Sequence, residues 1–505
     1  MTLICSTASR SLAALLAVGV VLGLSAHARA QHPQHIRPVP PVPAWTPGEL
    51  EISLSAIPRT QSILAGASTN VWSYTGFLVN GAPGSLVPVA NSFLGPTIHV
   101  LRGQHVTINL SNQLGEPTVT HLHGLDVPAS VDGHPSMAFP SGTTSTVSFP
   151  VLNRAGTYWY HPHPDMTTVE QVQMGLAGFF LVHDAEEARL NLPSGAFDVP
   201  VCIQDRTFDA SNQFVFNPNM LNGFFGSTML VNGVPNYVHQ TSSRVHRLRL
   251  LNGSSSRIYK LAFSDGTPMV VIGNDGGLLA APETKPYLML SPGERAEIWA
   301  DFRGRPVGTQ IVLRSLPFSG AGTSQGVALD VLRFEIIQGV TENRTLPATL
   351  SAITPYRLQD AVNASTPKTY AINLITSGGM PSFTLNGGLF SMFDVAANEI
   401  ARCGTLEVIR VTNTAGAMQI AHPIHFHGRQ FQILDRTVTA AGLANWNTVK
   451  DGYNNSGWKD TFMIMPGETV RILLRHGSYP GLFLYHCHNL VHEDMGMMRN
   501  FRLDP

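Results

Sequence analysis

Alternating runs of apolar and polar residues dominate the chain. Residues 98–110, 144–149 and 469–474 alternate or are rich in β-branched side chains, and Gly, Pro and Asn interrupt these runs. Long helical periodicity is scarce, and we expect a short helix at 186–192, near a domain boundary. The pattern predicts an all-β protein.

Two strand patterns recur along the chain and predict tandem domains. The first consists of a small residue, an alternating strand and a closing Asn, and occupies 103–112, 243–252 and 404–413. The second opens with Pro-Gly-Glu and occupies 292–298 and 466–472. Three copies of one β-sandwich of roughly 150 residues explain both patterns.

Length and composition fit this organisation. With 43% hydrophobic and 13% charged residues, the 505-residue chain is globular and holds enough apolar material for several cores. Its net charge of −1 gives no electrostatic basis for nucleic-acid binding. The boundaries predicted for the three sandwiches are 48–188, 189–345 and 346–505.

The N-terminus is typical of a secretory signal. Arg10 precedes an apolar run at 11–24, and Ala28-Arg29-Ala30 is a small-x-small cleavage site. No Arg-Arg pair is present, so we expect residues 1–30 to direct general export to the periplasm or medium, where metal is loaded. An uncleaved anchor is the alternative, but the run is short for a span of ~20 residues. No other transmembrane stretch is present, and residues 31–47 predict a flexible mature N-terminus.

The four cysteines differ in their surroundings. Cys5 would leave with the signal, and Cys487 stands apart because histidines flank it. Cys202 and Cys403 lie in or beside strand-like runs. They could be free thiols or one inter-domain disulfide, and the sequence leaves both open.

Cys487 belongs to a compact set of metal ligands. His486-Cys487-His488 is followed by His492 and Met497. A thiolate, an imidazole and a weak axial thioether are ligands of a blue-copper site, which needs one more histidine. Side chains alternate along a strand, so Cys487 would point one way and its two histidine neighbours the other. One strand would then connect two metal centres.

Ten of the 20 histidines fall in four clusters, two in the first predicted sandwich and two in the third. They are His121 with His123, His161 with His163, His422 with His425 and His427, and His486 and His488 with His492. The middle sandwich has only the separate His239 and His246, and we expect it to be a spacer.

The four His-x-His pairs supply eight imidazoles. Each pair places two imidazoles about 6.5–7 Å apart on one face of a strand, a spacing that suits two neighbouring metal ions better than one. An isolated pair is more often a surface accident or a fragment of a zinc site. Four pairs beside a Cys-His-Met set favour a three-copper cluster. His422, Cys487, His492 and Met497 remain for a mononuclear site, which gives four coppers per chain.

These motifs resemble those of the three-domain multicopper oxidases. His-Leu-His-Gly, Tyr-His-Pro-His, His-Pro-Ile-His-Phe-His-Gly and His-Cys-His-x3-His-x4-Met match the family's four copper motifs, and the similarity covers nearly all of 50–505. The resemblance implies three cupredoxin-like Greek-key sandwiches. No ligand position departs from the pattern, which argues against the family's copper-free members.

The resemblance also implies a role for each ligand. His422, Cys487, His492 and axial Met497 would bind the type 1 copper, and His121 and His425 the type 2 copper. The type 3 pair would be shared by His123, His161, His163, His427, His486 and His488. A small-molecule reductant would give electrons singly at type 1, Cys487 would pass them on, and the cluster would reduce dioxygen to water.

Two acids occupy positions that assist proton delivery in similar proteins. They are Asp132, nine positions after His123, and Glu493, next to His492. The alternatives are a plain Asp-Gly turn for Asp132 and a solvated or salt-bridged acid for Glu493.

The sequence leaves the reductant open. His-Leu-His-Gly-Leu-Asp-Val-Pro resembles the copper-resistance branch, whose members oxidise cuprous ion. That branch's methionine-rich insertion is absent here, and Met418 and Ile420 stand where its auxiliary site has an acid and a methionine. We expect a laccase-like oxidase of phenolic reductants, with cuprous oxidation as the alternative. A copper-binding or electron-transfer protein without oxidase turnover is the alternative from another class. One chain holds both halves of the cluster, so we expect a monomer.

Overall fold

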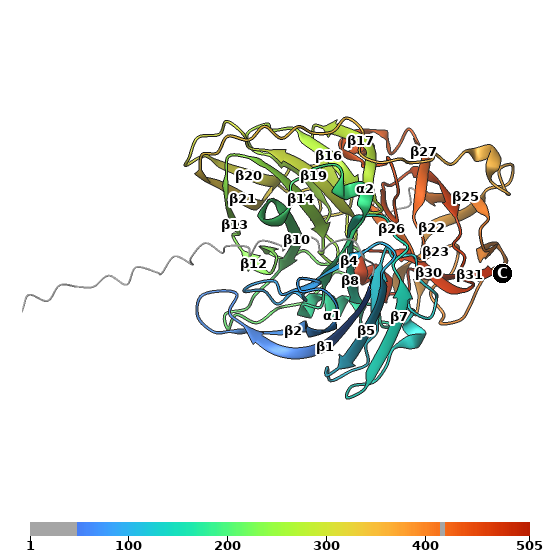
Figure 1. The fold of residues 1–505 in the computed structure, drawn as a ribbon. Coiled ribbons are helices and arrows are strands. Elements are labelled where there is room, and N and C mark those ends of the chain that lie inside the picture. The colour runs from blue at the N-terminus through green and yellow to red at the C-terminus, as the bar shows by residue number, and fades with distance from the viewer. Residues whose placement is uncertain (1–47, 415–419) are drawn as a thin grey trace, which may run out of the picture. The chain divides into compact units, whose positions relative to one another are not determined.

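The computed structural model describes residues 48–414 and 420–505, so the predictions for 1–30, for 31–47 and for Met418 fall outside the described residues. Within the described ranges nearly every element is a strand, which confirms the all-β prediction. The strands form six sheets. The chain alternates between two sheets at a time and fills three pairs of sheets in succession, which Figure 1 colours from blue through green and yellow to red.

The first two sheets use the strands between 49 and 183. Their strand orders are β2-β1-β5-β7 and β3-β4-β9-β8-β6. The bounds are β1 Glu49–Gln61, β2 Thr69–Asn80, β3 Leu86–Val87, β4 Thr97–Leu101, β5 His105–Asn112, β6 Thr120–His123, β7 Thr144–Pro150, β8 Gly156–Pro162 and β9 Gly178–His183. Leu54, Ile108 and Tyr160 belong to the apolar core between them.

The next two sheets use the strands between 198 and 338. Their orders are β12-β11-β10-β14-β19-β16-β17 and β13-β21-β20-β15-β18. The bounds are β10 Asp198–Arg206, β11 Thr228–Val231, β12 Val234–Pro235, β13 Val238–Ser242, β14 Val245–Asn252, β15 Tyr259–Phe263, β16 Met269–Asn274, β17 Gly277–Lys285, β18 Leu288–Leu290, β19 Arg295–Asp301, β20 Gln310–Ser315 and β21 Leu329–Gln338. They enclose a second core.

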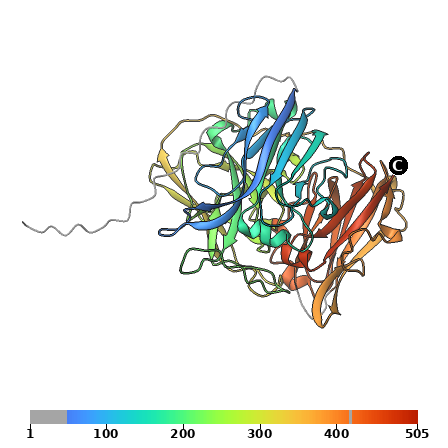
Figure 2. The ribbon, with the colours of Figure 1, turned by 90° about the horizontal axis from the view of Figure 1, so that it is seen from below.

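The last two sheets use the strands between 368 and 504. Their orders are β23-β22-β25-β29-β27 and β24-β31-β30-β26-β28. The bounds are β22 Lys368–Ser377, β23 Met380–Leu385, β24 Ile400–Arg402, β25 Leu406–Asn413, β26 His422–Phe426, β27 Phe431–Val438, β28 Thr461–Ile464, β29 Glu468–Arg475, β30 Gly481–Cys487 and β31 Met498–Asp504. A third core lies between them and includes Cys487. Figure 2 shows these orange and red strands grouped apart from the blue ones.

The recurring strand pattern occupies the same place in each pair of sheets. β5, β14 and β25 each have one parallel neighbour and one antiparallel neighbour. Each ends on a buried asparagine, Asn112, Asn252 or Asn413, whose side-chain amide donates to two backbone carbonyls. The amide satisfies backbone groups where the chain leaves the sheet. The repeats are therefore copies of one sandwich, whose boundaries stay a prediction.

Helices are short in the described residues. The helix expected at 186–192 is α2, Ala185–Ala188, which Asp184 caps by accepting a hydrogen bond from the Glu187 N–H. The others are α1 Thr168–Met174, α3 Leu443–Trp446 and α4 Leu490–Asp494. No helix among the described residues is long and apolar enough to cross a membrane.

Cys202 and Cys403 are free thiols, one buried and the other half-buried. The structure therefore selects the free-thiol alternative that the sequence left open. Burial raises the pKa of the Cys202 thiol to about 12, so this side chain behaves as a small apolar group in the core.

Candidate metal centres

Two adjacent strands carry candidate ligands on both of their faces. β26 pairs antiparallel with β30, with His425 opposite His486. His422 stands an odd number of residues before His425 and His427, so it shares a face with Cys487, whereas the other two share a face with His486. The alternation predicted from the sequence thus separates a sulfur site from a histidine site.

Cys487, His422 and His492 converge on one point. The Cys487 Sγ lies 3.5 Å from His422 Nδ1 and 3.6 Å from His492 Nδ1, and all three side chains are buried. A sulfur and a nitrogen bound to one ion in a trigonal plane are about 3.7 Å apart, at bond lengths near 2.3 and 2.0 Å. Met497 lies in the same apolar cluster, and its carbonyl accepts a hydrogen bond from the Cys487 N–H at 3.0 Å.

An aromatic ring, one backbone carbonyl and the Asn489 side-chain amide, whose Nδ2 lies 3.2 Å from His492 Nε2, lie against these two imidazoles. The ring of Phe383 lies 4.7 Å from that of His422 and 4.9 Å from that of His492, between centroids. The His492 Nε2–H donates to the Leu221 carbonyl at 2.8 Å. Burial lowers the pKa of His422 and that of His492, the latter to about 4. Both rings are therefore neutral near pH 7, as metal ligands must be.

Eight histidines from the first and third sandwiches meet on the other face. Their nitrogens form three close groups of three, each able to hold a metal ion: His163, His427 and His486; His123, His161 and His488; and His121, His123 and His425. His123 belongs to two of these groups, and a further group joins His121 and His427 with Asp132. Nitrogens that face one another in these groups lie 3.0–3.4 Å apart. Two nitrogens bound to one ion at about 2.0 Å are separated by about 3 Å.

Hydrogen-bond acceptors determine which nitrogen faces the centre. The Nδ1–H groups of His121, His161 and His425 donate to backbone carbonyls at 2.5, 2.9 and 2.9 Å, which leaves Nε2 to bind metal. His123 is reversed, because its Nε2–H donates to Asp460 Oδ1 at 3.2 Å and its Nδ1 faces the centre. Every fixed tautomer therefore presents a lone pair to the same region.

The donor set fits copper. Both ring nitrogens of His488 are buried and have no hydrogen-bond partner among the described residues, which is costly unless a cation binds there. Burial lowers the pKa of all eight imidazoles. Neutral imidazoles beside a thiolate–imidazole–thioether set are ligands that copper prefers.

Both predicted acids touch the histidine site. Asp132 Oδ2 accepts a hydrogen bond from the His427 Nδ1–H at 2.7 Å. Glu493 Oε2 lies 3.0 Å from His486 Nδ1, and its Oε1 lies 3.5 Å from His163 Nε2. Both carboxyls are buried, so Glu493 is not a solvated acid, and burial raises the pKa of each.

The sequence did not single out Asp460, which touches the same site. Its backbone carbonyl is the acceptor for His425, its carboxylate is the acceptor for His123, and Arg295 of β19 donates to both carboxylate oxygens. Burial raises the pKa of Asp460, but Arg295 outweighs it and holds that pKa well below its usual range. One signal was available: Arg295 stands in the second repeat pattern where the other copy has Thr469. Through Arg295 and Leu221, the middle sandwich is more than a spacer.

Comparisons with known proteins agree with this geometry. Two family models described as multicopper oxidase match residues 73–187 and 364–505. A laccase of Bacillus stratosphericus is 30% identical, with 85% of this chain and 90% of that protein covered. A bilirubin oxidase of Albifimbria verrucaria is 32% identical, with 81% and 71% covered.

The chain belongs to the multicopper oxidase family. The crystal structure of the McoA multicopper oxidase from Aquifex aeolicus superposes with a TM-score of 0.77 at 31% identity, covering 91% of this chain and 98% of that one. The predicted fold class and family are confirmed. As a multicopper oxidase, the protein is a copper-binding oxidoreductase that takes electrons from small-molecule reductants and passes them to dioxygen.

Proposed function

We propose that the protein is a laccase-like oxidase that holds four coppers and oxidises phenolic or other aromatic reductants. His422, Cys487, His492 and axial Met497 would hold type 1, and His121 with His425 would hold type 2. The type 3 pair would be held by His163, His427 and His486 on one side and by His123, His161 and His488 on the other. The groups of histidines beside a trigonal sulfur site carry this proposal. His123 is assigned to the type 3 pair because its Nδ1 faces His161 Nε2 at 3.4 Å, whereas its Nε2–H donates to Asp460.

Bound copper would supply one-electron redox chemistry, and the chain's residues connect and serve the two centres. Cys487 is joined directly to His486 and His488 along the backbone, and the His486 Nδ1–H donates to the Cys487 carbonyl at 3.1 Å. Cys487 therefore connects the sulfur site to the histidine site in two ways: through its peptide bonds to His486 and His488, and through the hydrogen bond from His486 to its carbonyl. Asp132 and Glu493, with raised pKa values, would hold protons that oxygen reduction consumes.

The surroundings of the sulfur site favour an organic reductant over a metal ion. Phe383 packs on both imidazoles. An apolar ring at these imidazoles suits an organic reductant, whereas a cationic substrate would be attracted by acids. Laccase and bilirubin oxidase relatives support the same class. Ile420, one of the two positions where cuprous oxidases carry the auxiliary-site acid and methionine, is a buried core residue.

We also propose that the protein is exported and acts as a monomer in the periplasm or medium. The signal pattern at 1–30 supports export. The presence of both halves of the histidine site in one chain supports a monomer.

Oxygen uptake by the copper-loaded protein tests the function, with copper content measured on the same sample. We expect about four coppers per chain. We also expect faster oxygen uptake with a phenolic reductant than with cuprous ion. Faster oxygen uptake with cuprous ion, lost in Met418→Ala, would instead indicate a cuprous oxidase that serves copper detoxification. Full copper without uptake on either reductant would leave an electron-transfer protein.

A further inference from the structure

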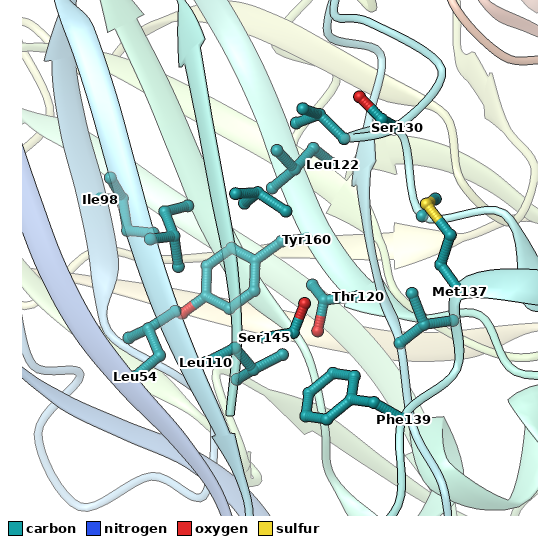
Figure 3. A pocket seen from close by; sticks show the side chains of 15 residues that line it. Leu54, Ile98, Leu110, Thr120, Leu122, Ser130, Met137, Phe139, Ser145 and Tyr160 are labelled. Carbon is teal, nitrogen blue, oxygen red and sulfur yellow. The ribbon is translucent and has the colours of Figure 1, made fainter. Parts of the chain in front are cut away.

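An apolar cavity of about 50 Å³ opens into the core of the first sandwich. Aliphatic side chains from both sheets line it, including Leu54 of β1, Ile98 of β4 and Leu110 of β5. Figure 3 shows these side chains with Tyr160 on one side and Ser130, Met137 and Phe139 on the other. β7 and β6 are the edge strands of the two sheets, and residues 130–139 lie at this edge.

The hydroxyls of the inner wall already have hydrogen-bond partners within the protein. The Tyr160 hydroxyl already donates to the Pro96 carbonyl at 2.7 Å, and the Thr120 hydroxyl is hydrogen-bonded to that of Tyr74 at 2.8 Å. A buried water needs two to four polar partners, and apolar cavities without them stay dry or bind apolar guests. An apolar cavity that admits benzene measures about 150 Å³. The cavity here suits an apolar molecule of a few atoms and is too small for a phenol.

The cavity shares its wall with the strands that carry the histidines. Thr120 and Leu122 alternate with His121 and His123 on β6, so the strand faces the cavity on one side and the histidine site on the other. Tyr160 stands in the same relation to His161 on β8. One layer of main chain separates the two spaces here.

The Asp132 turn forms part of this wall. Val131 and Gly133, which flank Asp132, both line the cavity. A Cβ on Gly133 would lie 2.6 Å from the Cα of His121 and 2.5 Å from the Thr120 carbonyl oxygen. Main chain touches main chain here without side chains between.

We propose that this cavity binds dioxygen and holds it beside the histidine site. The inference rests on the proposed oxidase function, because only an oxygen-consuming enzyme gains from it. Dioxygen is apolar, has two heavy atoms and partitions from water into apolar surroundings, so size and lining both select it. A small apolar guest enters between β7 and residues 130–139, where Ser145 and Phe139 are half-buried.

Ser145→Phe would plug the cavity from β7 without touching a histidine. Its matched control is Thr146→Phe, because Thr146 is the next residue on the same strand, is exposed and does not line the cavity. Crystals of the copper-loaded wild type and both variants would be exposed to xenon, and the KM for dioxygen would be measured with a fixed reductant.

Xenon should occupy the cavity in wild type and Thr146→Phe but not in Ser145→Phe. The KM for dioxygen should rise several-fold in Ser145→Phe alone, with the KM for the reductant, copper content and blue absorption unchanged. Absence of xenon from the wild-type cavity overturns the proposal whether or not Ser145→Phe folds, and so does an unchanged KM for dioxygen in a plugged cavity. Xenon bound in a wild-type protein that consumes no oxygen would instead overturn the oxidase function and, with it, the dioxygen assignment.

Discussion

Arg295 donates to Asp460 through both ends of its guanidinium, Nη1 to Oδ1 at 2.7 Å and Nη2 to Oδ2 at 2.5 Å. Its remaining N–H groups donate to the carbonyls of Thr157, Gly293 and Asp275, so all five donors are used. The pair therefore joins β8 and β19 to the residue just before β28, one segment from each sandwich, directly behind the histidine site.

Removal of Arg295 should destabilise the protein strongly. Arg295→Ala leaves the Asp460 carboxylate buried without its partner, which should lower the free energy of unfolding by about 3–5 kcal/mol. The control is Arg303→Ala, which breaks the half-exposed pair with Asp301 and should cost about 0–1 kcal/mol. Urea midpoints of the copper-free proteins measure both. Equal midpoints for the two variants would show that the buried pair does not hold the sandwiches together.

The approach of Gly133 to His121 leaves no room for a side chain. Gly133→Ala should displace the His121 main chain and lower copper content and oxygen uptake together. Gly142→Ala is the control, because Gly142 also has a positive φ but a Cβ there would meet no atom within 4 Å. Gly142→Ala should lower the free energy of unfolding only by the cost of a non-glycine residue at positive φ, about 1–2 kcal/mol. Full copper content in Gly133→Ala would contradict this account of the turn.

Glu493→Gln should slow oxygen reduction without affecting electron entry. The amide keeps the size of the side chain but cannot deliver a proton, and loss of general acid catalysis costs about 10²–10⁴-fold in rate. Oxygen uptake should fall in that range. Anaerobic bleaching of the blue band by the reductant should keep its wild-type rate. Slower bleaching would instead place Glu493 in the structure of the sulfur site.

His239, away from every metal ligand, should make stability depend on pH. Burial lowers its pKa to about 4 in the folded protein, against about 6.5 when unfolded. Between these values the unfolded chain binds a proton and the folded protein does not, so stability is full above pH ~6.5 and falls as pH drops toward ~4. The loss is at most about 3 kcal/mol.

The His239→Phe variant removes this titration and should make the fall of the unfolding midpoint between pH 7 and 4 less steep. Other buried histidines with lowered pKa values, such as His246 and His99, keep the rest of the slope. His105→Phe, an exposed substitution on β5, is the control and should leave the wild-type slope. A slope shared by wild type and His239→Phe would mean that His239 is already protonated in the folded protein.

Local sequence patterns predicted the sheets and the candidate ligands because both depend on alternation. The closing Asn of each repeat marks the end of one strand, and the odd spacing of His422 from His425 assigns them to opposite faces. Contacts between residues far apart in the sequence were not predicted, because local patterns carry no information about them. Arg295 is 165 residues from Asp460, and Leu221 is 271 residues from His492. The helix at 186–192 was predicted too long, since only α2 forms there.

The proposed function requires that electrons pass through Cys487 to the histidine site. Oxygen uptake by the copper-loaded wild type and Cys487→Ser tests this requirement most directly. Wild type should consume one dioxygen for every four phenolic electrons and release no hydrogen peroxide. Cys487→Ser should lose the blue colour, keep its fold and the copper of the histidine site, and consume no oxygen with the same reductant. Uptake by Cys487→Ser at the wild-type rate would show that electrons reach the histidine site by another route.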